Sequence, residues 1–131
     1  MDIQKQKLTI LEVSEATGLS SHTLRYYERI GLIHPIEREE NTRRLYTEED
    51  LGWIDFLLKL RATGMSIKEM QEYAELQRQG DVTLPQRVEM LKSLREHVEA
   101  RMSELGEHLK LICYKIEIYE QIVTEKELEK S

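Results

Sequence analysis

The sequence predicts a mainly α-helical protein, in which a small head is followed by one long helix. Three observations support this fold class. Only two prolines occur among 131 residues, helix-start signals recur throughout the first part of the chain, and an apolar heptad pattern runs from residue 84 almost to the end. A content of 40% hydrophobic and 34% charged residues fits a modest core with long solvated helix faces.

The head begins with two short predicted helices joined by a tight turn. Thr9 and Glu12 have the spacing of a capping box before an apolar stripe, and Gly18 ends this first helix. Ser20 caps a second helix that runs to Gly31. Two short helices joined by a glycine-bearing turn are typical of a helix-turn-helix.

Two short extended segments are expected after the second helix. Pro35 excludes a helix interior in residues 33–38, and residues 43–46 have the composition of a second strand after a polar turn. We therefore expect a small β-hairpin, which would act as the wing of a winged helix-turn-helix.

The remainder of the head is predicted to be two further helices. Thr47 precedes a segment that is apolar on nearly all sides, which indicates the centre of the core. Gly64 ends this helix, and Ser66 caps another that runs to about Gly80. The predicted head domain is residues 7–80, with flexible ends at residues 1–6 and 128–131.

The long helix, predicted for residues 83–127, carries apolar residues at alternating spacings of four and three, and Arg95 is the only charged member of this seam. Such a repeat over five heptads indicates a coiled coil. A helix of roughly 60 Å cannot bury its seam on a small head, so a homodimer is expected. The predicted dimerisation residues are Val88, Leu91, Val98, Met102, Leu105, Leu109, Ile112, Ile116 and Tyr119.

Bulk composition limits the classes of function. The formal net charge of −6 argues weakly against a nucleic-acid binder, because a basic domain is the usual footprint of that class. The single cysteine excludes an internal disulfide framework and indicates a reducing, cytoplasmic setting. The chain has no apolar run near transmembrane length, so no membrane partner is expected.

The second helix carries an unusual mixture of arginine and tyrosine. At ~100° per residue, four side chains share one face and Leu24 and Tyr27 lie on the other. The four are His22, Arg25, Tyr26 and Arg29. Arginine binds phosphates and guanine edges, so this face suits a nucleic-acid duplex. The alternative is an ordinary amphipathic helix whose charged face is only solvated.

The predicted wing repeats the same chemistry. Arg43, Arg44 and Tyr46 follow the helix closely, and a wing of this kind contacts backbone phosphates while a helix reads the bases. The alternative for the two arginines is a charged edge strand that resists aggregation.

An ordered series of matches extends this pattern over residues 7–76. The matching residues are Thr9-Ile10, Glu12-Val13, Gly18-Leu19-Ser20, Thr23-Leu24-Arg25-Tyr26-Tyr27-Glu28-Arg29, Gly31-Leu32-Ile33, Pro35, Arg44, Tyr46, Asp50-Leu51, Leu60-Arg61, Gly64-Met65-Ser66-Ile67 and Glu69-Met70. In these residues the chain resembles the MerR family of bacterial transcription regulators.

The resemblance implies a winged helix-turn-helix head and an antiparallel coiled-coil dimer. It also implies binding to a palindromic promoter with an overlong spacer, which the dimer bends and untwists so that RNA polymerase can use it. RNA polymerase would therefore be an indirect partner at the promoter.

The resemblance also assigns roles to individual residues. It places Arg25 and Tyr26 in the major groove, assisted by His22 and Thr23 at the helix start. Arg44 and Tyr46 would hold phosphates from the wing. The wing departs from the family, which often has Gly-Tyr-Arg where this chain has Thr42-Arg43-Arg44, so Arg43 is included for its charge alone.

The signal that such a regulator would sense is not evident from the residues. Metal sensing needs several thiolates or imidazoles close together, and Cys113 has only His97 and His108 in its neighbourhood, so no metal is expected. Residues 53–61 resemble the small aldehyde- and thiol-stress branch, but Lys59 stands where members can carry a cysteine.

Cys113 remains as the candidate thiol sensor, and the alternative is an inert helix cysteine. In the implied antiparallel coil the two Cys113 Cα atoms would lie roughly 25 Å apart, whereas a disulfide needs less than ~7 Å. Any response would therefore be modification by an electrophile.

The sequence therefore predicts a homodimeric regulator that binds double-stranded promoter DNA, with no catalysis and no cofactor. The alternative is a coiled-coil interaction module whose head binds protein. An enzyme is the weakest interpretation, because the chain has no paired-carboxylate pattern, glycine-rich phosphate loop or nucleophile motif.

Overall fold

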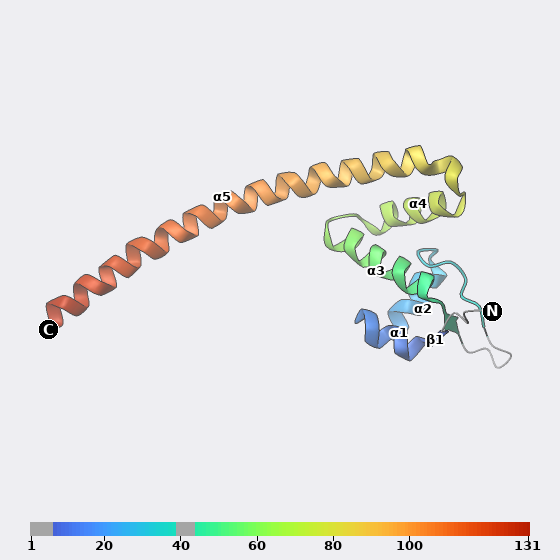
Figure 1. Cartoon of the computed structure of the whole chain (residues 1–131), viewed down its shortest axis with the longest axis horizontal. Coiled ribbons are helices and arrows are strands. Elements are labelled where there is room, and N and C mark those ends of the chain that lie inside the picture. The colour runs from blue at the N-terminus through green and yellow to red at the C-terminus, as the bar shows by residue number, and fades with distance from the viewer. Residues whose placement is uncertain (1–6, 39–43) are drawn as a thin grey trace, which may run out of the picture. The chain divides into compact units, whose positions relative to one another are not determined.

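The computed structural model describes residues 7–38 and 44–131 and is mainly helical, which confirms the predicted fold class (Figure 1). In chain order the elements are β1 (Leu8–Thr9), α1 (Ile10–Thr17), α2 (Ser21–Arg29), β2 (Leu45–Tyr46), α3 (Glu48–Ala62), α4 (Ile67–Arg78), the 3₁₀ turn η1 (Asp81–Thr83) and α5 (Leu84–Lys130). The chain forms two compact units, a head that ends at Leu94 and a helical unit of Arg95–Ser131.

Local side chains set the helix starts. Thr9 Oγ1 accepts a hydrogen bond from the Glu12 amide at 3.2 Å, and the Glu12 carboxylate accepts one from the Thr9 amide at 2.9 Å. The same reciprocal box opens α3 and α4, while the Ser20 hydroxyl alone caps α2. These contacts satisfy amide groups that a helix leaves unpaired in its first turn. The predicted cap residues are confirmed.

The two-stranded sheet differs from the predicted hairpin. Strand β2 pairs antiparallel with β1, so that Leu8 lies opposite Tyr46 and Thr9 lies opposite Leu45. The segment before the wing tip contributes an isolated bridge between Arg38 and Arg44, outside the named strands. The sheet forms with residues near the N-terminus because that pairing turns Tyr46 into the core, where its apolar ring is buried.

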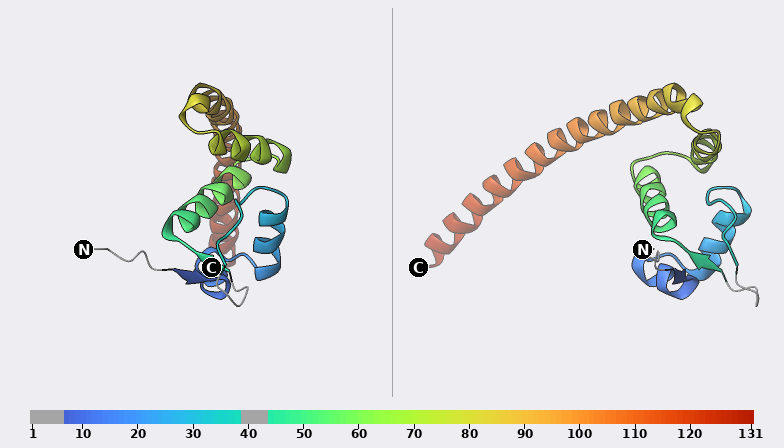
Figure 2. Two further views of the ribbon diagram at one scale, coloured as in Figure 1. Left: turned by 90° about the vertical axis from the view of Figure 1, so that its right-hand side faces the viewer. Right: turned by 45° about the vertical axis from the view of Figure 1, so that its right-hand side comes forward.

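The core of the head gathers side chains from all five α-helices. Figure 2 shows α1 to α4 arranged around this region. Helix α3 supplies Ile54, Leu57 and Leu60, which are at most 3% exposed. The half-buried rings of Trp53 and Phe56 on α3 pack against Tyr73 on α4. The expectation that the helix after Thr47 forms the centre of the core is confirmed.

The first turns of α5 belong to the head. Met90, Leu91 and Leu94 pack against the core, and Leu91, expected in the dimer seam, is therefore half-buried within its own chain. Arg87 is only 8% exposed. The compact head unit thus extends to Leu94 and includes the first turns of α5.

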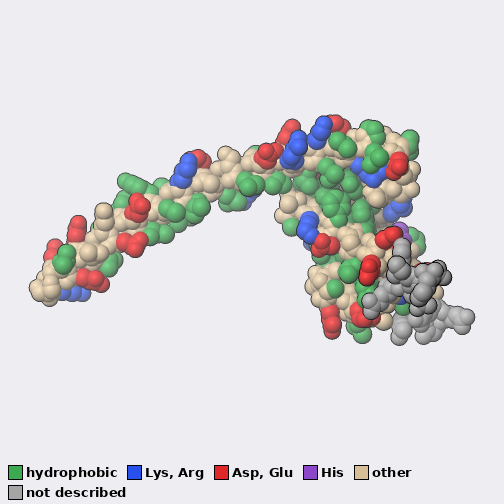
Figure 3. Space-filling model, in the orientation of Figure 1, with side chains coloured by type: hydrophobic (Ala, Val, Ile, Leu, Met, Phe, Trp, Pro, Cys, Tyr) green, Lys and Arg blue, Asp and Glu red, His purple; other side chains and the backbone are tan. Residues whose placement is uncertain are grey.

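The remainder of α5 has no buried residue of its own. The helix contains 47 residues, which corresponds to a length of roughly 70 Å. Apolar side chains lie exposed along its C-terminal part, as Figure 3 shows. Within the described ranges, no helix is both long and apolar enough to cross a membrane.

Candidate nucleic-acid interface

Helix α2 has two distinct faces. Leu24 and Tyr27 are 0% and 2% exposed and pack into the core. His22, Arg25, Tyr26 and Arg29 are exposed on the other side. The division expected from the helical period is therefore confirmed, and the predicted contact residues of this helix lie on a solvent-facing surface.

The exposed face has an internal arrangement of its own. The Arg29 guanidinium lies over the Tyr26 ring, 5.5 Å from its centroid, which restrains both side chains. Arg25 is exposed and forms no ion pair with any described residue, so its N–H donors face solvent. Thr23 is half-buried and receives a hydrogen bond from the Ser20 hydroxyl at 2.9 Å. The result is a surface with one unpaired guanidinium and one that is held on an aromatic ring.

Glu28 connects α2 to the wing. One of its carboxylate oxygens accepts a hydrogen bond from Arg44 Nε at 2.8 Å, and the other accepts one from the Ile36 amide at 3.2 Å. Arg38 Nη2 lies 3.7 Å from the same carboxylate. The Glu28 side chain is only 11% exposed, so these charge-assisted contacts are shielded from water. Glu28 therefore fixes both sides of the wing against α2.

The sequence analysis assigned no role of this kind to Glu28. The position of Glu28 along the helix could have indicated this role from the sequence. Glu28 follows Leu24 by four residues, so it lies on the side of α2 that turns towards the core. A carboxylate at such a position needs partners from another element.

The structure corrects the role that was predicted for Tyr46. Its side chain is 0% exposed, and its hydroxyl has no hydrogen-bond partner among the described residues. The predicted phosphate contact of Tyr46 is therefore wrong, because the register with Leu8 turns the ring inwards. Burial raises the pKa of Tyr46, and the nearby Glu28 carboxylate raises it further, while Arg44 and Arg25 act in the opposite direction. The hydroxyl is consequently neutral at ordinary pH.

The wing arginines are not equivalent. The Arg44 side chain is 20% exposed and its charge is paired with Glu28. Arg43 lies outside the described residues. Arg38, which the sequence analysis left out of the site, is 44% exposed and stands opposite Arg44 in the bridge. The place of Arg38 among the other arginines of the predicted wing segment could have indicated it as a site residue from the sequence.

Side chains from α3 and α4 hold the chain that leaves α2. The carbonyl oxygens of Ile30, Gly31 and Leu32 accept hydrogen bonds of 2.8–3.0 Å from three separate donors. Gln71 Nε2 donates to the Ile30 carbonyl, Arg78 Nη1 donates to that of Gly31, and Trp53 Nε1 donates to that of Leu32. Arg61 on α3 also donates to the Tyr27 hydroxyl. The last turn of α2 is therefore tied to two other helices, which fixes the direction of its exposed face.

The part of the chain that the structure describes contains no group of three or more His, Cys, Asp or Glu placed to hold a metal ion. Cys113 is a free, exposed thiol on α5.

The capped helix pair, the bridged wing and the exposed arginine–tyrosine face together define a helix-turn-helix regulatory protein. Residues 8–77 match the family model described as MerR HTH family regulatory protein. Residues 51–110 match a second model, described as MerR, DNA binding. The chain belongs to the MerR family and is a MerR-type DNA-binding transcriptional regulator, not an enzyme.

Similar proteins cover nearly the whole chain. The crystal structure of a MerR family transcriptional regulator from Listeria monocytogenes is 42% identical, with a TM-score of 0.85, over 94% of this chain and 95% of its own. HiNmlR, described as a MerR family regulator lacking the sensor domain and bound to promoter DNA, is 33% identical with a TM-score of 0.81, over 88% and 92%. The uncharacterised regulator YyaN of Bacillus subtilis is 35% identical, over 90% and 94%.

Proposed function

We propose that the chain binds a palindromic promoter as a homodimer, with α2 of each subunit in the major groove. The observation that carries this proposal is the exposed face of α2, whose orientation is fixed at the last turn by α3 and α4. Arg25 and Tyr26 would read base edges, with His22 and Thr23 at the helix start. The relative HiNmlR is bound to promoter DNA in its crystal structure, which supports the same role here.

We expect the wing to contribute to DNA binding through its fixed position beside α2 as well as through its charge. Arg44 is 20% exposed and lies 2.8 Å from Glu28, whereas Arg38 is 44% exposed and lies 3.7 Å from the same carboxylate. Arg38, together with the exposed Arg29, is therefore the better candidate for contacts with backbone phosphates. Local cations on this surface compensate for a chain whose formal net charge is −6. We therefore expect few phosphate contacts per subunit and a moderate dependence of affinity on salt.

The homodimer is proposed from the surface of α5. Met102, Leu105, Leu109, Ile112 and Ile116 are each about half exposed or more at the predicted seam positions. A row of apolar side chains on a solvated helix is the pattern that a coiled-coil partner buries. An antiparallel pair would set the distance between the two α2 helices. Such a dimer would distort the promoter and thereby control its use by RNA polymerase.

Selection from a random DNA library with the full chain, followed by titration of the selected duplex, tests this function. We expect affinity to fall as salt rises, because phosphate contacts release counterions. Arg25→Gln should reduce the preference over a scrambled duplex by about tenfold, which corresponds to the loss of one good base contact. Lys110→Gln, the same charge change on α5, should leave that preference intact.

A chain that enriches no sequence and binds both duplexes equally would contradict the proposal. That result would favour the alternative, a coiled-coil module whose head binds protein, although family membership does not favour it.

A further inference from the structure

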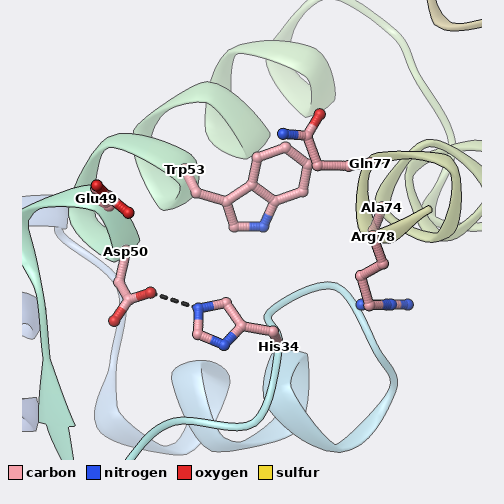
Figure 4. Close-up of a pocket in the computed structure, with 7 residues that line it drawn as sticks. All are labelled: His34, Glu49, Asp50, Trp53, Ala74, Gln77 and Arg78. Carbon is pink, nitrogen blue, oxygen red and sulfur yellow. Dashed lines mark hydrogen bonds and ion pairs between the residues drawn. The ribbon is translucent and has the colours of Figure 1, made fainter. Parts of the chain in front are cut away.

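A cavity of about 220 Å³ opens within the head, beside the segment that follows α2. Its walls come from the start of α3, the end of α4 and the loop at His34 (Figure 4). The side chains that matter are His34, Glu49, Asp50, Trp53, Gln77 and Arg78. None of them belongs to the exposed face of α2, so this cavity is separate from the proposed DNA surface.

Trp53 supplies a fixed flat wall. Its indole N–H donates to the Leu32 carbonyl at 2.8 Å, and its ring stacks on Tyr73 with centroids 6.1 Å apart. The indole lies between the Asp50–His34 pair and Gln77, as Figure 4 shows. Because both restraints hold the ring, it offers a rigid apolar plane for a second planar ring.

The acceptors in the cavity are already used. One Asp50 oxygen lies 2.5 Å from His34 Nε2, and the other accepts the Thr47 amide at 2.9 Å. His34 Nδ1 lies 3.0 Å from the Pro35 carbonyl oxygen. Both ring nitrogens therefore face oxygen atoms of the protein, so the imidazole and the Asp50 carboxylate already have partners within the head.

Donors, in contrast, remain available. The Gln77 side-chain oxygen accepts a hydrogen bond from Arg87 at 2.7 Å, which fixes the amide and leaves its NH₂ group pointing over the indole (Figure 4). Arg78 is held at Gly31 and Glu75, and a guanidinium has five N–H donors in all. A site with a flat aromatic wall and surplus donors suits a planar ring that carries an anionic acceptor.

We propose that this cavity binds a small planar aromatic carboxylate. The ring of the ligand lies on Trp53, and its carboxylate accepts hydrogen bonds from the Gln77 amide and the Arg78 guanidinium. Glu49 lines the same cavity and opposes a negative ligand, so it limits the affinity.

The site also connects two functional parts of the head. Trp53 and Arg78 hold the carbonyls at the end of α2, and Gln77 holds Arg87 in the first turns of α5. A ligand carboxylate held by the remaining N–H groups of Gln77 and Arg78 places a negative charge on the side chains that make these hydrogen bonds. It therefore alters how α3 and α4 hold the end of α2 and changes DNA affinity, a consequence that rests on the proposed function.

Trp53 is the single tryptophan of the chain, so its fluorescence reports on the cavity directly. The full chain is titrated with sodium benzoate, and separately with benzamide, its neutral analogue. We expect a saturable change in emission with benzoate and at least about tenfold weaker binding of benzamide, because a charge-assisted hydrogen bond is lost. Equal binding of the two probes, or no saturable change with benzoate, overturns the proposal.

Variants locate the site. Arg78→Gln should weaken benzoate binding about tenfold, Glu49→Gln should strengthen it, and Lys59→Gln, an exposed α3 cation outside the cavity, should change nothing. Thermal melting of each variant shows whether it is folded. If Arg78→Gln and Lys59→Gln behave alike in folded proteins, the assignment is wrong.

The affinity for the selected DNA duplex is then measured with and without saturating benzoate. A change of about threefold or more, a modest coupling between two sites, supports the link to α2. An unchanged affinity overturns the link. A protein that binds no DNA contradicts the proposed function, and the fluorescence titration then still decides whether the cavity is a ligand site.

Discussion

At the scale of single residues, Glu28 is the acid that shapes a surface otherwise rich in cations. Its carboxylate holds Arg44 at 2.8 Å and the Ile36 amide at 3.2 Å in a largely buried position. A carboxylate on the proposed DNA surface would repel phosphate, so we attribute its presence to the order that it gives to the wing.

Glu28→Gln tests this role while keeping the size of the side chain. The free energy of unfolding should fall by about 1–3 kcal/mol, because a shielded hydrogen bond to a charged group is weakened. Chemical denaturation measures the change. Glu15→Gln, at an exposed position on α1, is the matched control and should be nearly neutral. Equal effects of the two substitutions would contradict the assigned role.

Tyr46 leads to a prediction that depends on pH. The hydroxyl is buried without a partner among the described residues. Tyr46→Phe should therefore raise the free energy of unfolding by about 1 kcal/mol. Burial raises the pKa of Tyr46 above its ordinary value of 10.0, which applies to the unfolded chain. The stability linked to this group is therefore complete below pH 10 and is lost as pH rises through the higher folded pKa.

Denaturation of wild type and Tyr46→Phe at pH 8 and at about pH 10.5 separates this effect from the other titrating groups. The advantage of the variant should grow at the higher pH. The exposed Tyr26→Phe should show no such growth, and a constant advantage for Tyr46→Phe would contradict the linkage.

Single residues also show where sequence reasoning succeeded and failed. Tyr27 was correctly placed in the core, because it follows Leu24 by three residues and both lie on the buried face of one helix. Tyr46 was misplaced, because the inward side of a two-residue strand depends on its register with Leu8, far away in sequence. Helical periodicity is local information, and strand register is not.

At the scale of elements, the end of α2 depends on donors from α3 and α4. Gln71→Leu removes the donor to the Ile30 carbonyl while the side chain keeps a similar size. Stability should fall by about 1 kcal/mol and DNA affinity should fall with it, because the last turn of α2 loosens. Gln79→Leu, at an exposed position after α4, is the control for added apolar surface. Unchanged DNA affinity in Gln71→Leu would contradict the coupling.

Helix α5 gives the corresponding prediction for assembly. Leu105→Ser combined with Leu109→Ser should convert a dimer into a monomer, because two exposed apolar seam residues are lost. Sedimentation equilibrium measures the mass, and Ala100→Ser, at a position off the seam, is the control. A wild-type chain that is already monomeric would contradict the assignment of the seam.

The elements themselves were largely predictable, because each capping box lies within four residues of sequence. The four helix caps, the glycine after α1 and the long helix α5 all needed no information beyond their own segment. The predicted hairpin was less accurate, because the strand pairing depends on the long-range contact of Leu8 with Tyr46.

At the scale of the whole molecule, the head carries the proposed recognition surface on α2, and α5 carries exposed apolar side chains at the predicted seam positions. Each half is incomplete alone, since a single short helix reads few base pairs and an unpaired seam leaves apolar area in water. A two-fold dimer would supply a second reading helix and would bury the apolar seam. It would place the two α2 helices one helical turn of DNA apart, roughly 34–36 Å, or a whole multiple of that distance.

Sedimentation of the full chain with its selected DNA duplex tests this account most directly. The account predicts two chains on each duplex, on a sequence with two-fold symmetry, and loss of that complex in the Leu105→Ser, Leu109→Ser variant. One chain per duplex, with an affinity that the double substitution does not change, would contradict recognition by a dimer.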